Sequence, residues 1–208
     1  VQFIAVLMPD LVGRQPAGTE VLVLEMGMRG LGEIAELCSI ARPTIGVITR
    51  VAEAHSDRVG GIEGVARAKA ELIAALPHDG LAILNADDVR VRAMASQSAA
   101  PVLLYGDAPD ADVRLDDLRL DDIARPSFLL HTPWGQCRVH LAASGRHMAH
   151  NAAAALACVG AIGGDLQGAA AALAEVGLTA MRMEVQRTAA GAIVLNDSYN
   201  ANPTSVRA

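Results

Sequence analysis

Aromatic residues are scarce, because Phe, Trp and Tyr together make up 2% of the 208 residues. The hydrophobic core must therefore be built from aliphatic side chains, and the 52% hydrophobic fraction supplies them. Basic residues are too few for an electrostatic nucleic-acid partner, since the net charge is −6 at pH 7 and that class of protein normally carries a basic surplus. The composition indicates a compact globular protein that binds no nucleic acid.

Cysteine is also scarce, and its three positions are far apart in the chain. Cys38, Cys137 and Cys158 form no CxxC pair, so we expect no disulfide framework and a reducing, cytoplasmic environment. No apolar run approaches the roughly 20 residues of a membrane span. The chain begins without Met and stops abruptly after Ala208, which is typical of a piece of a longer protein.

Lysine is the most restricted residue type. Sixteen of the 17 basic residues are Arg, and the only Lys is Lys69. The chain therefore cannot contain a GxxxxGK[ST] phosphate loop in addition to Lys69. Codon bias is the plain explanation for the count, and retention of one primary amine for chemistry is the alternative.

The first half of the chain alternates short apolar runs with segments of helical periodicity. Strands are predicted at 21–26, 45–49, 81–84 and 102–105, and helices at 31–41, 62–76 and 88–95. Strands that alternate with helices predict an α/β fold with a mostly parallel sheet.

The second half has a different pattern. Alternating stretches between 107 and 141, with a turn at 132–136, predict antiparallel strands at one edge of the sheet. Ala-rich helices are expected at 146–162 and 166–176, followed by strands at 183–187 and 192–196. We predict a central domain over 1–181 and the first strand and turn of a second α/β domain over 182–208.

Two polar residues follow predicted strands in the first half. Glu25 ends the predicted strand 21–26, and His55 comes after the strand 45–49. Ligands of open α/β sheets bind beyond the carboxyl ends of strands, so these side chains are candidate Mg²⁺ ligands. A solvated Glu and a plain loop His are the alternatives.

Lys69 lies on the apolar stripe of its predicted helix, between Ile62 and Leu76. Burial would lower the pKa of its ammonium and leave a nucleophilic amine, which can take up CO₂ as an anionic carbamate. The alternative is a lysine whose charged end reaches solvent.

Polar residues near the end of the chain suit a nucleotide. His147 and Asn151 lie four residues apart on one helix face, and an Asn amide can pair with the edge of adenine. Asp197 follows a predicted strand, where it could hold a ribose hydroxyl or simply cap the next helix. The segment 85–88 is likewise either a helix cap or a catalytic element.

Seven short motifs, in this order, resemble the Mur ligase family of ATP-dependent amide-forming enzymes in peptidoglycan synthesis. The matching elements are EMG at 25–27, AH at 54–55, ARAKAE at 66–71, LNADD at 84–88, GRH at 145–147 with NA at 151–152, RME at 182–184 and NDSYNANP at 196–203. The first and last motifs are most similar to the family members that add D-alanyl-D-alanine.

The resemblance implies a role for each of several residues. Glu25, His55 and a carbamylated Lys69 would bind Mg²⁺, and His55 and Lys69 would serve catalysis. The remaining matches would bind ATP, with adenine on Asn151, ribose on Asp197 and further contacts from His147, Arg182, Asn200 and Asn202. The substrates would be a UDP-N-acetylmuramoyl-tripeptide and D-alanyl-D-alanine, and we expect a monomer.

Two other functions are compatible with the sequence. One is another Mur ligase or a folylpolyglutamate synthase-like ligase. The other is a non-catalytic nucleotide- or metal-binding module, which is favoured by the missing phosphate loop and by Arg50, where the family usually has Asn. Met148 and residues 1–18 also depart from the family pattern, and we expect the isolated piece to be inactive as a ligase and to bind ATP weakly.

Overall fold

The structure is a computed structural model that describes residues 18–52, 59–177 and 182–199. It divides into two compact units, Val1–Leu103 and Leu104–Ala208. No helix of the described residues is long and apolar enough to cross a membrane.

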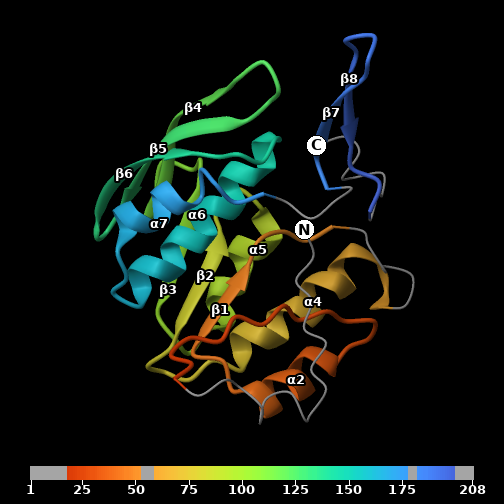
Figure 1. Cartoon of the computed structure of the whole chain (residues 1–208). Helices are drawn as coiled ribbons and strands as arrows, with labels where there is room; N and C mark the ends of the chain where they lie inside the picture. The colour runs from red at the N-terminus through yellow and green to blue at the C-terminus, as the bar shows by residue number, and fades with distance from the viewer. Residues whose placement is uncertain (1–17, 53–58, 178–181, 200–208) are drawn as a thin grey trace. The chain divides into compact units, whose positions relative to one another are not determined.

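The first unit pairs two parallel strands with helices. Its elements are α2 (Glu33–Ala41), β1 (Ile45–Ile48), α4 (Gly61–Ala74), β2 (Leu81–Asn85), α5 (Val89–Ala93) and the 3-10 helix η1 (Met94–Gln97). β1 and β2 are parallel, with Ile45 opposite Leu81. Figure 1 shows α4 beside β1, and a Cβ on Gly46 of β1 would lie only 3.1 Å from Leu76 and 3.2 Å from Leu72. This glycine allows helix and strand to approach closely.

The second unit begins within β3 (Val102–Gly106) and carries the antiparallel strands. Its other elements are β4 (Val113–Leu120), β5 (Pro126–Thr132), β6 (Gly135–His140), α6 (Arg146–Ala161), α7 (Leu166–Ala172), β7 (Glu184–Arg187) and β8 (Ile193–Asn196). β3 pairs with β4 in parallel, whereas β4–β5 and β5–β6 are antiparallel. Strands β1 to β6 follow one another in sheet order, and β7 and β8 form a separate two-stranded sheet. The expected α/β fold with an antiparallel edge is confirmed.

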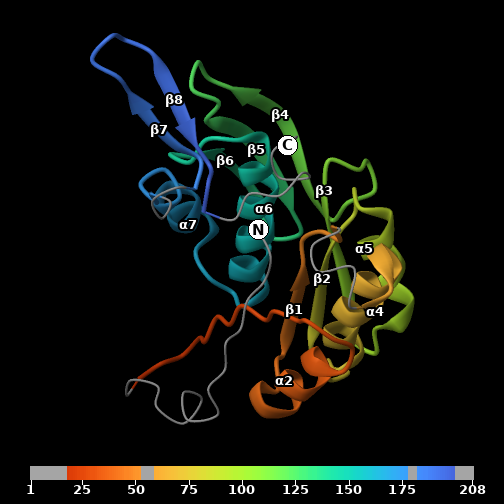
Figure 2. The ribbon, with the colours of Figure 1, turned by 90° about the vertical axis from the view of Figure 1, so that its right-hand side faces the viewer.

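Small side chains let α6 lie close to its sheet. Ala149, Ala153 and Ala157 of this helix are all fully buried, and the helix packs against β4 and β5 (Figure 2). At its far end the ring of Trp134, from the β5–β6 turn, covers Gly160, where a Cβ would lie 2.2 Å from the ring. The core is mostly aliphatic, as the scarcity of aromatics predicts, but it also contains the fully buried rings of Tyr105 and Phe128, whereas Trp134 stays 43% exposed.

The expected strand over 21–26 is wrong. None of residues 19–28 is in a strand, and the side chain of Val23 is 89% exposed. An apolar, branched run forms a buried strand only where a neighbouring strand bonds to it, and β1 is the first strand of its sheet in the order observed. Only the end of the run is buried, where Met26 Sδ lies 3.9 Å from Cys38 Sγ of α2.

The N-terminus of α2 is capped by a side chain from another helix. Gly32 precedes α2 with a φ of 87° and has no capping side chain of its own. Instead, the carboxylate of Glu71 on α4 accepts hydrogen bonds from the backbone N–H groups of Gly32 (2.7 Å) and Ala35 (3.1 Å). This carboxylate satisfies two helix-end donors and attaches α2 to α4.

We expect Glu71→Ala to lower the free energy of unfolding by about 1–2 kcal/mol, the usual contribution of a helix cap. Urea denaturation of the purified chain measures it. The matched control is Glu63→Ala on the same helix, which removes an exposed 2.7 Å ion pair with Arg90 and an acidic side chain from the first turn of α4, but no hydrogen bond to the start of α2. Equal, small losses for both variants would contradict the capping role.

Candidate functional site

The side chain of Lys69 reaches from α4 to the carboxyl end of β1. Its Nζ donates a 2.6 Å hydrogen bond to the backbone carbonyl of Arg50, two residues after the strand. The flanking helix residues Val65, Leu72 and Ile73 are buried. Lys69 therefore lies on the apolar face of its helix, as the spacing predicts.

Burial lowers the pKa of the Lys69 ammonium from 10.5 to about 8, although the nearby carboxylate of Asp88 raises it. A primary amine with this pKa has a neutral fraction near physiological pH that an exposed lysine lacks. The uncharged form is the one that reacts with CO₂. Lys69 contacts only the backbone carbonyl of Arg50, so this hydrogen bond does not depend on which side chain the residue carries.

Asn85 and Asp88 hold the loops around Lys69 in place. Asn85 Nδ2, at the end of β2, donates to the carbonyl of Thr49 at 2.7 Å. Asp88 Oδ2 accepts from the backbone N–H of Val51 at 2.9 Å, while its Oδ1 caps α5. The cap expected within 85–88 is confirmed, and the same carboxylate connects the loop after β1 to that helix.

Of the two proposed metal ligands Glu25 and His55, the structure describes only Glu25. Glu25 is half-buried, but it does not end a strand, so the strand-end argument for its position is wrong. His55 lies outside the described residues, as do Asn200 and Asn202. The convergence of Glu25 and His55 on one metal ion stays a prediction.

The first turns of α6 carry the predicted adenine residues. His147 lies over Gly145, where a Cβ would be only 2.7 Å from the imidazole. Gly145 also has a φ of 110°, so both its backbone conformation and the close approach of the imidazole favour a glycine there. One turn later, Asn151 Nδ2 donates to Met148 Sδ at 3.6 Å, a weak acceptor that a nucleotide base can replace at little cost.

Two further predicted nucleotide residues, Arg182 and Asp197, lie at the base of the β7–β8 hairpin. Asp197 Oδ1 accepts a 3.1 Å hydrogen bond from the backbone N–H of Met183. The guanidinium of Arg182 lies 4.6 Å from the centroid of the Tyr199 ring. Asp197 therefore joins the two ends of the hairpin rather than capping a helix within the described residues.

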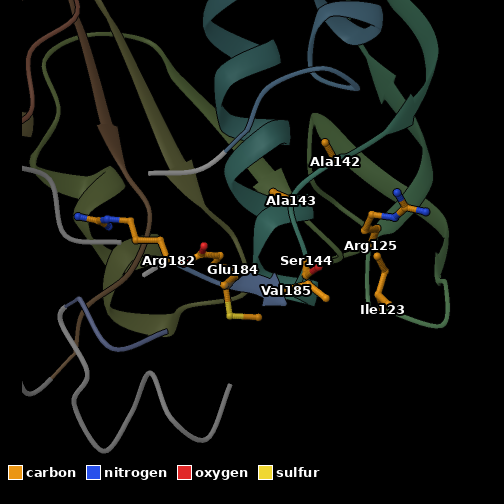
Figure 3. Close-up of a pocket in the computed structure, with 9 residues that line it drawn as sticks. Ile123, Arg125, Ala142, Ala143, Ser144, Arg182, Glu184 and Val185 are labelled. Atoms are coloured by element: carbon orange, nitrogen blue, oxygen red, sulfur yellow. The ribbon is translucent and has the colours of Figure 1, made fainter. Parts of the chain in front are cut away.

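A pocket of about 250 Å³ brings this hairpin together with the segment before α6. Figure 3 shows Ser144 beside Glu184 and Val185, with the Arg182 side chain extending away from them. Ser144 is 2% exposed, and Ile123 and Arg125 also line the pocket. Arg182 and the loop leading to His147 thus border one pocket.

Several residues of the site were missed by sequence reasoning. Ile123 and Arg125 belong to the β4–β5 turn, which carries no recognisable motif. The Arg50 carbonyl is a backbone group, which no side-chain pattern can reveal. Asp88 was identified as part of a helix cap or a catalytic element, but its proximity to Lys69 was not predicted, because it depends on how α4 packs.

The sequence model of the Mur ligase middle domain matches residues 5–159 of this chain. A UDP-N-acetylmuramoyl-tripeptide–D-alanyl-D-alanine ligase from Mycobacterium tuberculosis is 42% identical over 201 residues, which are 96% of this chain and 39% of the relative. This chain spans about two fifths of the length of the curated relatives it matches.

Two solved structures are similar to the fold. MurF from Acinetobacter baumannii has a TM-score of 0.82 and 30% identity, covering 89% of this chain and 40% of the other. The MurF ligase from Thermotoga maritima in complex with ADP has a TM-score of 0.79 and 27% identity, covering 92% and 44%.

The pKa of Lys69 predicts a pH-dependent stability. Between pH 8 and 10.5 the folded chain binds fewer protons at this lysine than the unfolded chain, so raising the pH favours folding. Relative to Lys69→Met, the unmodified chain should gain at most about 3 kcal/mol across this window. Paired urea titrations at several pH values measure the difference in free energy of unfolding between the two chains. The contributions of the other titrating groups cancel in this difference. A pH-independent difference would contradict the lowered pKa.

Proposed function

Because the chain belongs to the Mur ligase family through its middle domain, we propose that it is the central part of an ATP-dependent ligase that adds D-alanyl-D-alanine to a UDP-N-acetylmuramoyl-tripeptide. The observation that carries the proposal is a similarity over 96% of the chain to a ligase with that name. The position of the only lysine supports it, since Lys69 lies at the carboxyl end of a parallel strand, where α/β sheets bind ligands.

In this proposal the second unit binds the nucleotide. Asn151 would exchange its weak thioether contact for the edge of adenine, with His147 on the same helix face. Arg182 would contact the nucleotide and Asp197 the ribose, together with Asn200 and Asn202. The similarity to a ligase solved with ADP supports this assignment.

The reaction would take place in two steps. A carboxylate oxygen of the tripeptide attacks the γ-phosphorus of ATP, and ADP leaves. The amine of D-alanyl-D-alanine then attacks the acyl carbon, and phosphate leaves as the amide forms and the amine loses a proton. Catalysis of this kind depends mainly on positioning and on compensating negative charge.

Lys69 would act as a carbamate. Its neutral amine adds to CO₂ and releases a proton, which replaces a cation with an anion at the same place. One N–H remains on the carbamate nitrogen, and the Arg50 carbonyl, now 2.6 Å from that nitrogen, can continue to accept it. This backbone contact would orient the new carboxylate.

The residues fit a magnesium site in their chemistry. Glu25 offers carboxylate oxygens, a carbamylated Lys69 adds two more, and His55 adds an imidazole, whereas an ammonium at Lys69 would repel a cation. Mg²⁺ bound there would reduce the repulsion between the tripeptide carboxylate and the polyphosphate.

A reducing, cytoplasmic location is supported by three free cysteines, Cys38, Cys137 and Cys158.

Phosphate release tests the proposed function directly. A protein of the relatives' full length that carries these residues should release phosphate from ATP only when both the UDP-linked tripeptide and D-alanyl-D-alanine are present. Release with a different amino acid or with a folate acceptor would identify another ligase of the family or its folylpolyglutamate synthase-like relatives. ATP binding without release under any condition would support the non-catalytic module instead.

Substitutions of Lys69 in that protein should separate charge from carbamate chemistry. We expect Lys69→Arg to lose activity by at least about 100-fold despite its positive charge, because a guanidinium forms no such carbamate. Lys69→Ala should be equally poor and should recover in part when acetate or another short carboxylic acid is added. The control is Arg67→Ala, an exposed residue on the same helix, which should retain activity. Full activity of Lys69→Arg would exclude the carbamate.

A further inference from the structure

Asp107 makes two contacts with the first turns of α6 that the proposed nucleotide chemistry does not use. It directly follows β3. Its Oδ2 accepts a 3.2 Å hydrogen bond from Arg146 Nη2 and lies 3.3 Å from His150 Nε2. One carboxylate oxygen of the sheet thus contacts two side chains that are one helical turn apart.

These two helix residues lie next to the proposed nucleotide residues. Arg146 and His150 are four residues apart and therefore lie on the same face of α6. His147 and Asn151 follow them by one residue each and form the neighbouring row of side chains on the helix. Because the helix is a rigid unit, a rotation that moves Arg146 and His150 turns the neighbouring row by the same angle. A contact that holds Arg146 and His150 therefore determines where His147 and Asn151 project.

The other end of this contact is firmly placed. β3 is hydrogen-bonded to β4, with Tyr105 opposite Val113 and Gly106 opposite Arg114. The side chain of Tyr105 is fully buried. Asp107 therefore extends from a paired strand end and links the sheet to the start of α6.

We propose that Asp107 is a positioning residue of the nucleotide site, which orients His147 and Asn151 by holding Arg146 and His150. This inference rests on the proposed function, because it takes His147 and Asn151 as the residues that meet the nucleotide. Asp107 itself touches no substrate in this account.

The size of the effect follows from the exposure of the groups. The side chains of Asp107 and Arg146 are 41% and 57% exposed, and that of His150 is 20% exposed. Partly exposed ion pairs contribute little to global stability, so Asp107→Asn should fold normally. The Asn side chain keeps an oxygen acceptor but lacks the negative charge that strengthens both contacts, so ADP binding should weaken about three- to ten-fold through misorientation of the helix.

NMR titration of the 208-residue chain with ADP is the test, followed at the side-chain amide of Asn151. Asp107→Asn should raise the dissociation constant about three- to ten-fold with the melting temperature unchanged. It should also speed hydrogen exchange at the backbone amides of Met148 and Asn151. His150→Gln, which keeps a donor, should bind ADP more tightly than His150→Ala. The matched control is Asp122→Asn, an equal change of charge at an exposed turn residue of the same unit.

The possible failures are distinguishable. If the unmodified chain shifts its Asn151 signal with ADP and Asp107→Asn binds equally well, the positioning role is excluded while the proposed function stands. A loss of affinity accompanied by a lower melting temperature would mean that Asp107 acts only on folding. If ADP does not affect the unmodified chain at all, the nucleotide site and this extension of it both fail.

Discussion

The candidate site around Lys69 depends most on one short hydrogen bond, which the Lys69 ammonium donates to the Arg50 carbonyl. An ammonium on the apolar face of a helix loses hydration, and one hydrogen bond to a carbonyl replaces only part of the stabilisation that water gives to the charge. This imbalance lowers the pKa of the amine to about 8, despite the attraction of Asp88. A carbonyl oxygen carries no net charge and can accept a hydrogen bond either from an ammonium or from the remaining N–H of a carbamate. The same contact is therefore compatible with both states of the side chain.

Carboxylates provide the other connections on which the candidate site depends. Glu71 links α4 to the start of α2, and Asp88 links the loop after β1 to the start of α5. In the second unit, Asp107 links the end of β3 to the start of α6. Each carboxylate lies close to the N-terminal end of a helix, where the helix dipole favours a negative charge. The loops that carry functional side chains thus receive their positions from paired strands and packed helices.

Periodicity was sufficient to predict most of the elements. The strands at β1, β2 and β3, the antiparallel edge and the Ala-rich α6 all lie close to their expected positions, because each one has an apolar pattern that its neighbours bury. The segment 21–26 has the same pattern and forms no strand, since pairing depends on a neighbour that composition does not reveal. For the site, helical phase correctly located Lys69 on the apolar face of its helix. The Arg50 carbonyl and the Asp107 contact depend on tertiary packing, although an acidic residue directly after a strand is the signal that could have identified Asp107.

The central claim is that Lys69 supplies a neutral amine that becomes a carbamate. ¹³C NMR of the chain in ¹³C-bicarbonate at pH 8 tests it most directly, because Lys69 is the only lysine and a lysine carbamate can arise nowhere else. We predict one CO₂-derived carbamate signal beyond that of the N-terminal amine, and its loss in Lys69→Arg. The same spectrum from the unmodified chain and from Lys69→Arg would contradict the account.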